Sequence, residues 1–114
     1  MKIKAELPKT LSEGAHTGII DKVEYRHEPF EYVDFWIKTT NEEEKAIRYG
    51  CPGKLSVATK LGKLLSAFDV KIEPGKEYDP EILIGRKVSF VVFTEETDKG
   101  TFSRIAEGSL KPLK

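Results

Sequence analysis

The sequence contains very few of the residues that define certain protein classes. Cys51 is the single cysteine among 114 residues, so no internal disulfide can form. His16 and His27 are the only histidines, and together with Cys51 they do not have the spacing of a zinc site. No window approaches the roughly 18 uninterrupted apolar residues of a membrane span, and the segment MKIKAELPKT lacks the apolar run of a secretory signal. We expect a cytoplasmic protein without metal, cofactor or membrane association.

Heat-labile residues are also scarce. Gln is absent, Asn41 is the only Asn, and Cys and Met occur once each, whereas Lys and Glu are abundant. This composition is typical of proteins from thermophiles, so a thermophilic source is a hypothesis.

The charges balance over the whole chain but not along it. Lys plus Arg and Asp plus Glu number 19 each, so the molecule has no net charge to attract a polyanion. Two segments are nevertheless basic, namely residues 51–68, whose charges are all lysines, and residues 99–114, where Glu107 is the only acid. Acidic residues gather elsewhere, at 42–44 and 95–98. A basic face on a neutral protein is therefore compatible with the sequence.

No motif indicates catalysis. In YGCPGKLS, residues 49–56, Gly53 precedes Lys54 as in a phosphate-binding loop. Arg48 occupies the position of that loop's first glycine, and Leu55 occupies the position of its Ser or Thr. The isolated His and Cys residues form no recognisable nucleophile and base, and the carboxylates lie mostly in polar turns. We expect a protein that is not an enzyme.

Periodicity predicts one domain with five strands and one helix. Alternating apolar residues predict strands over 15–25, 30–39, 45–51, 86–96 and 101–108. Apolar residues from Val57 to Phe68 recur at helical spacing, with Ser56 as the predicted cap. DPEILIG, residues 79–85, predicts one or two further helical turns. We divide the chain into an N-terminal arm (1–14), the domain (15–108) and a short basic C-terminal tail (109–114).

Three strands, a helix and two further strands is the order of the OB-fold, a five-stranded, partly open barrel. A single open sheet would leave two unpaired edges, which proteins tend to avoid. The alternative is a small half-open sheet capped by the helix. We predict the all-β, OB-fold-like barrel with one helix.

The second predicted strand, FEYVDFWIKT, has an unusual outer face. Alternation places Val33, Phe35 and Ile37 on the core side and leaves aromatic residues and Lys38 on the other. In OB-folds, outward rings stack on the bases of single-stranded nucleic acid while cations hold its phosphates. Asp34 lies in the middle of this face and would repel a phosphate.

We predict that Tyr32 and Trp36 stack on bases, roughly 13 Å apart at about 3.3 Å per residue. Lys38 continues their face, and Arg48 and Arg104 would contact phosphates from the third and fifth strands. For Phe102, packing against protein is the competing interpretation. The remaining predicted contacts are Phe102, Lys54, Lys60 and Lys99.

The expected partner is single-stranded DNA, bound with little sequence preference, and RNA stays open as an alternative. The same face also suits a protein partner, because Trp and Tyr are enriched among interface anchors. Zero net charge favours that second interpretation. The alternative function is a protein-interaction or assembly domain that docks on a replication protein or on a second copy.

Four segments resemble a known family: LPKTLSEGAHTGIIDKVE, TKLGKLLSAF, DPEILIGRKVSFVV and GTFSRI. They span nearly the whole chain and are similar to small phage and prophage proteins, often described as domains of unknown function, that look like single-stranded DNA-binding OB-folds. The resemblance implies a coating or annealing role for single-stranded DNA in replication and recombination. It assigns no binding residue.

Overall fold

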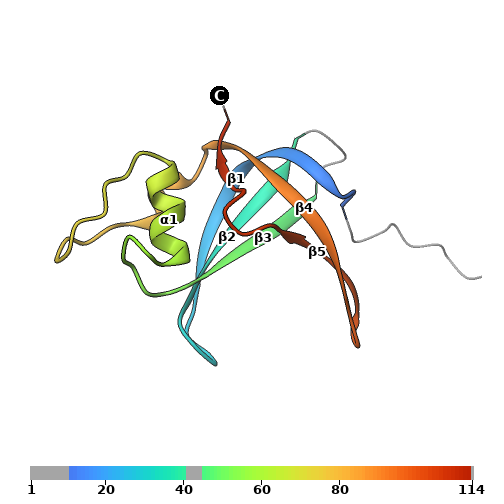
Figure 1. Ribbon diagram of the computed structural model, residues 1–114, viewed down its shortest axis with the longest axis horizontal. Coiled ribbons are helices and arrows are strands. Elements are labelled where there is room, and N and C mark those ends of the chain that lie inside the picture. The colour runs from blue at the N-terminus through green and yellow to red at the C-terminus, as the bar shows by residue number, and fades with distance from the viewer. Residues whose placement is uncertain (1–10, 41–44, 114) are drawn as a thin grey trace, which may run out of the picture.

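The computed structural model describes residues 11–40 and 45–113, which form one antiparallel sheet with a helix at one end (Figure 1). Helix α1 (Lys60–Ala67) and the 3-10 helix η1 (Pro80–Leu83) lie between β3 and β4 in the chain. The predicted order of three strands, a helix and two strands is confirmed, and a short sixth strand follows. The strands are β1 (Gly14–Arg26), β2 (Tyr32–Thr39), β3 (Ala46–Pro52), β4 (Lys87–Thr97), β5 (Gly100–Ile105) and β6 (Lys111–Pro112).

The strands are arranged in the order β3-β2-β1-β4-β5, and β6 pairs with β4. The long strand β1 pairs with β4 over Gly14–Ile19 and with β2 over Gly18–Arg26. Gly18 lies where both partners meet, and a Cβ added there would lie 2.6 Å from the Lys38 carbonyl oxygen. Absence of a side chain at Gly18 therefore allows the backbone of β2 to approach β1 closely.

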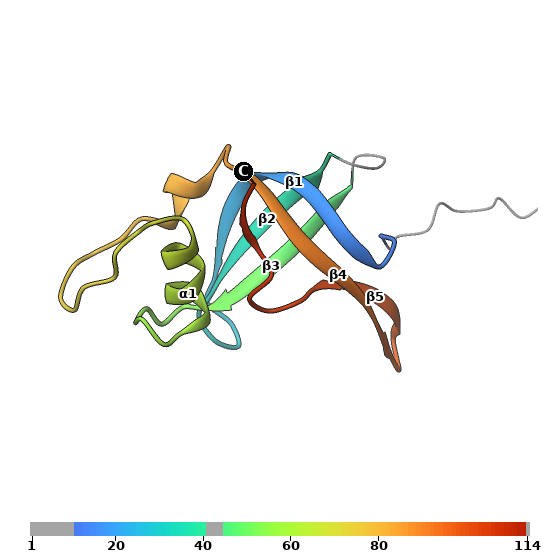
Figure 2. The same cartoon turned by 45° about the horizontal axis from the view of Figure 1, so that its top comes forward.

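The sheet curls so that its two edge strands, β3 and β5, lie near each other (Figures 1 and 2). Within the described residues, no backbone ladder joins β3 to β5. The chain is thus a mostly β protein with one helix and an open antiparallel sheet, and over these residues the sheet does not close into a barrel through a β3–β5 ladder. Arg48 of β3 and Arg104 of β5 line the space between the two edges.

The core lies inside the curl and confirms the predicted alternation in β2. Val33, Phe35 and Ile37 are buried and pack with apolar residues of β1, β3 and β4. Helix α1 closes one end of this core with its buried leucines. These are Leu61, Leu64 and Leu65.

The helix begins later than predicted. Its cap is Thr59 rather than Ser56, because the Thr59 hydroxyl accepts a hydrogen bond from the Gly62 backbone N–H at 3.1 Å. Val57, predicted on the apolar stripe, precedes the helix and is 66% exposed. The predicted turn over 79–85 is confirmed, since Asp79 caps η1 by accepting from the Glu81 N–H at 2.9 Å.

Both predicted terminal segments contribute to the sheet where they are described. Residues 1–10 of the arm lie outside the described residues, but Leu11 is buried and its N–H donates to the Ser103 hydroxyl at 2.7 Å. In the predicted tail, Leu110 is buried and β6 pairs with β4. Among the described residues, no helix is long and apolar enough to cross a membrane.

Candidate nucleic-acid interface

Two adjoining hollows lie between the facing edges of the sheet, and we call them together the β3–β5 groove. The Trp36 hollow has a volume of about 370 Å³ and is lined by β2, β3 and β5 residues. The Tyr32 hollow has a volume of about 190 Å³ and lies nearer to the helix. Arg48 and Arg104 line both. The other principal residues are Trp36, Phe102 and Lys45 in the first hollow, and Tyr32, Arg26, Gly50 and Lys60 in the second.

The strand register places cations on both sides of Trp36. Trp36 lies opposite Lys22 on β1 and Arg48 on β3. The Lys22 ammonium is 5.5 Å and the Arg48 guanidinium 6.0 Å from the ring centroid. Both distances are within the range of cation–π attraction. The half-buried indole also has a buried Nε1–H without a hydrogen-bond partner in the described residues.

Tyr32 is covered by Arg26, whose guanidinium carbon lies 4.7 Å from the ring centroid. Arg26 also donates two hydrogen bonds to Asp34, from Nε at 2.5 Å and from Nη2 at 3.0 Å. The hydrogen bond with Asp34 raises the pKa of Arg26 above its ordinary value. Asp34 is therefore buried and paired, and the repulsion of phosphate expected from its sequence position is largely neutralised.

Gly50 opens the floor of the Tyr32 hollow. It lies opposite Asp34 in the β2–β3 ladder, and a Cβ there would be 2.9 Å from Asp34 Oδ1 and 3.6 Å from the Tyr32 ring. The missing side chain thus makes room for the Arg26–Asp34 pair and the Tyr32 ring beside it.

The groove cations differ in how far they are neutralised. Arg104 donates from Nε to Glu95 at 3.1 Å and lies 5.6 Å from the Phe102 ring centroid. Lys60 is the first residue of α1, with its ammonium 4.3 Å from the Tyr49 ring centroid. Among the residues that the structure describes, neither Arg48 nor Lys60 forms an ion pair with a carboxylate. These two cations carry the uncompensated positive charge of the groove.

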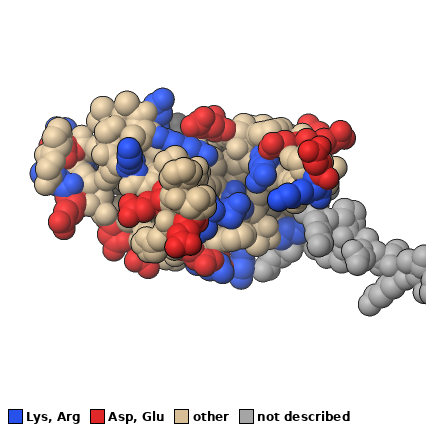
Figure 3. Space-filling view, turned by 90° about the horizontal axis from the view of Figure 1, so that it is seen from below, with Lys and Arg blue, Asp and Glu red and all other residues tan. Residues whose placement is uncertain are grey.

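Charged side chains of both signs are spread over the surface. In the view of Figure 3, Lys and Arg side chains alternate with Asp and Glu side chains, and acidic side chains lie near the middle as well as toward the right-hand end. The β4–β5 hairpin carries three acidic residues, Glu95, Glu96 and Asp98. Among the described residues that line the two hollows, the charged ones are all Lys or Arg, so a neutral protein presents a basic groove.

The structure brings together six of the nine predicted binding residues. Three lie outside both hollows: Lys38 near the end of β2, which pairs with Asp21 at 3.7 Å, and the exposed Lys54 and Lys99. Phe102, for which packing was the competing interpretation, is 41% exposed. The six that line the groove are Tyr32, Trp36, Arg48, Lys60, Phe102 and Arg104.

Sequence reasoning missed Lys22 and Arg26, which cover Trp36 and Tyr32. The predicted first strand ended at residue 25, one position before Arg26. The pairing of Arg26 with Tyr32 could have been predicted from the length of the hairpin loop. Residues 27–31 connect the two strands, so Arg26 and Tyr32 lie directly opposite each other. Counting outward from that loop on both strands gives their pairing.

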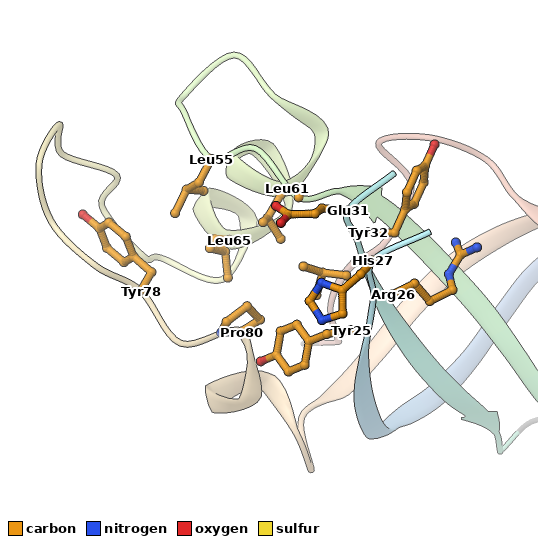
Figure 4. Close-up of a pocket in the computed structure, with 12 residues that line it drawn as sticks. Tyr25, Arg26, His27, Glu31, Tyr32, Leu55, Leu61, Leu65, Tyr78 and Pro80 are labelled. Atoms are coloured by element: carbon orange, nitrogen blue, oxygen red, sulfur yellow. The ribbon is translucent and has the colours of Figure 1, made fainter. Parts of the chain in front are cut away.

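A separate cleft of about 290 Å³ lies beside the helix (Figure 4). Tyr25, His27 and Pro80 line it from one side and the helix leucines from another, whereas the tips of Tyr32 and Arg26 extend toward the groove.

No group of three or more potential metal ligands occurs within residues 11–40 and 45–113. Burial raises the pKa of the Cys51 thiol to about 12, so the thiol is neutral at physiological pH.

The chain matches no protein-family model, and no curated protein is detectably similar to it.

Proposed function

We propose that this protein is a non-enzymatic single-stranded DNA-binding protein built on an OB-fold-like barrel. The order β3-β2-β1-β4-β5 and the helix between β3 and β4 fit that fold, in which β3 and β5 are neighbours. The observation that carries the function is the convergence of aromatic rings and arginines in the β3–β5 groove. A replication or recombination role is part of the proposal.

In the proposed mode of binding, bases stack in the two hollows and the cations hold the backbone. Tyr32 and Phe102 each have a guanidinium near the ring, at 4.7 and 5.6 Å from the centroid. Trp36 has both Lys22 and Arg48, at 5.5 and 6.0 Å. An incoming base takes the place of a guanidinium or stacks upon it, since planar Arg also stacks on rings. The displaced guanidinium is then close to the phosphate of the same nucleotide.

The decisive experiment uses Trp36, the only tryptophan, as a probe. Oligothymidylate of about 15 nucleotides, within the usual OB-fold site range, should quench Trp36 fluorescence to saturation. Affinity should fall steeply as salt rises, because phosphate contacts release counterions. Oligouridylate in parallel compares RNA with DNA. Absence of any binding at low salt, measured also by anisotropy of a labelled oligonucleotide, contradicts the function.

A matched pair of variants tests the stacking. Trp36→Leu should weaken binding about 5- to 150-fold, corresponding to about 1 to 3 kcal/mol per stacked base. Phe30→Leu removes a ring that is 72% exposed but lies outside both hollows, and it should leave affinity unchanged. Equal effects of the two substitutions would count against a base on Trp36.

A second candidate function is protein docking or self-assembly through the same region. The β4–β5 hairpin exposes Val91, Phe93 and Phe102, each by more than 40%. Light scattering over a range of protein concentrations tests for a dimer, and an apolar interface should be nearly indifferent to salt. Dimer formation that competes with the oligonucleotide would favour this second function.

A further inference from the structure

The two arginines shared by the hollows occupy a special position. Arg48 and Arg104 line both hollows, whereas Trp36 lines only one and Tyr32 only the other. Arg48 comes from β3 and Arg104 from β5, so the pair faces across the open seam of the sheet. A ligand that places bases in both hollows therefore runs past these two guanidinium groups.

Both arginines can bind an anion without breaking a buried ion pair. Arg48 has no carboxylate partner in the described ranges, and its contact is the 6.0 Å approach to the Trp36 ring. Arg104 uses Nε for Glu95, and both side chains of that pair are more than 40% exposed. Exposed ion pairs contribute little to stability, so a phosphate can replace Glu95.

Arg26 does not share this freedom. Its two hydrogen bonds hold the buried carboxylate of Asp34, so it supports the Tyr32 ring and the floor of the hollow. If Arg26 turned to a ligand phosphate, the buried Asp34 carboxylate would lose its partner. Arg48 and Arg104 can bind a phosphate without leaving a buried charge unpaired.

We infer that Arg48 and Arg104 form a single phosphate clamp, which grips one phosphodiester where the strand passes from the Trp36 hollow to the Tyr32 hollow. The inference rests on the proposed function and specifies its central contact. Guanidinium groups suit this role because they present several donors in a planar fork to phosphate oxygens.

The test is the dependence of affinity on salt for the full chain and oligothymidylate of about 15 nucleotides. Each phosphate neutralised on a single strand contributes about 0.7 to the slope of log affinity against log salt. Arg48→Gln and Arg104→Gln alone should each change the slope by less than this, because the other arginine still holds the phosphate. The double variant should lose about 0.7 in total.

The control Lys71→Gln/Lys87→Gln removes two exposed charges away from the groove and should leave the slope unchanged. Arg48→Lys/Arg104→Lys keeps both charges and should retain the slope with weaker affinity. A loss of about 0.7 in each single variant and about 1.4 in the double assigns two separate phosphates and overturns the clamp. No change in the double variant also overturns it, while failure of the unmodified protein to bind overturns the proposed function as well.

Discussion

At the scale of single residues, Gly62 fixes the start of the helix that closes the core. It is buried on α1, and a Cβ added there would lie only 1.6 Å from the backbone oxygen of Ser56. The carbonyl of Ser56 also accepts from the Thr59 hydroxyl at 3.0 Å, so the loop cannot easily move aside. Helix propensity alone would favour Ala over Gly at this position by about 1 kcal/mol.

Gly62→Ala should therefore destabilise the protein by about 2 kcal/mol or more, because overpacking outweighs the gain in propensity. Urea unfolding followed by circular dichroism gives the free energy of unfolding. Ser66→Ala, at an exposed site of the same helix, is the control and should be neutral or slightly stabilising. Equal stability of Gly62→Ala and the parent protein would show that the loop accommodates the methyl group.

Cys51 links stability to alkaline pH. Burial raises its pKa from 9.0 to about 12 in the folded protein, so the fold favours the neutral thiol. Stability from this group is complete below pH 9 and declines as the unfolded thiol ionises, until the folded thiol ionises near pH 12. Between pH 8 and pH 10.5 the parent protein should lose about 1 to 2 kcal/mol more than Cys51→Val does. Parallel urea titrations at the two pH values measure this difference, and identical losses would contradict it.

At the scale of elements, β6 is short but anchors the C-terminal segment. Leu110 is 2% exposed, and Lys111–Pro112 pair with Ser89 and Val88 of β4. Only two residues of regular strand form, yet the apolar side chain that precedes them enters the core.

Leu110→Ala should lower the free energy of unfolding by about 2 to 5 kcal/mol, as for other buried leucines. Leu113→Ala removes the same group from a site that is 44% exposed and should cost less than about 0.5 kcal/mol. Thermal or urea unfolding of both variants makes the comparison. Similar effects of the two would mean that residues 109–113 behave as the tail expected from the sequence.

The core face of β2 could be predicted from the sequence, whereas the start of α1 and the proximity of the two sheet edges could not. Val33, Phe35 and Ile37 alternate because one side of β2 faces the core, so the period reports burial directly. The start of α1 was predicted three residues too early because Ser56 and Thr59 are both suitable caps, and only the close packing of Gly62 against the Ser56 carbonyl distinguishes them. Periodicity also could not predict that β3 and β5 lie near each other. The alternation within a strand indicates which of its residues are buried, but it does not indicate which strands lie beside it.

For the groove, strand alternation predicted which side chains share a face, and so identified Tyr32, Trp36 and Arg48. It did not predict that Asp34 on the same face would be buried beneath Arg26. A carboxylate with an arginine eight positions away gives no signal until the hairpin register is known. The aromatic and basic residues of the groove were therefore predictable from the sequence, but the ion pair between Arg26 and Asp34 was not.

At the scale of the whole molecule, zero net charge coexists with a groove whose charged lining residues are Lys and Arg. Substitution of Glu95 or Glu96 by Gln can separate the effect of net charge on DNA affinity from the effect of the Arg104–Glu95 ion pair. Either substitution adds one unit to the net charge, but among the described residues only Glu95 pairs with Arg104. Glu96 follows Glu95 and points to the opposite side of β4. If local pairing controls affinity, only Glu95 restrains a groove cation.

Glu95→Gln should thus tighten oligothymidylate binding severalfold at low salt, and Glu96→Gln should do so less, because its charge acts only through screened solvent. Fluorescence anisotropy with a labelled strand measures both affinities. Equal gains would indicate that net charge, rather than the Arg104–Glu95 contact, governs the interaction.

The outer half of the β4–β5 hairpin is expected to be more mobile than the rest of the sheet. β4 pairs with β1 only up to Val92, and from Phe93 to Thr97 its strand partner in the described residues is β5 alone. Two-stranded ribbons are weakly stable by themselves, so amide protons of this hairpin should exchange with solvent much faster than those of β2, which lies between β1 and β3. The β5 wall of the groove is thus expected to be more mobile than the central strands of the sheet. If bending of this hairpin adjusts the width of the groove, a bound ligand should slow amide exchange at Phe102 and Arg104, which line it.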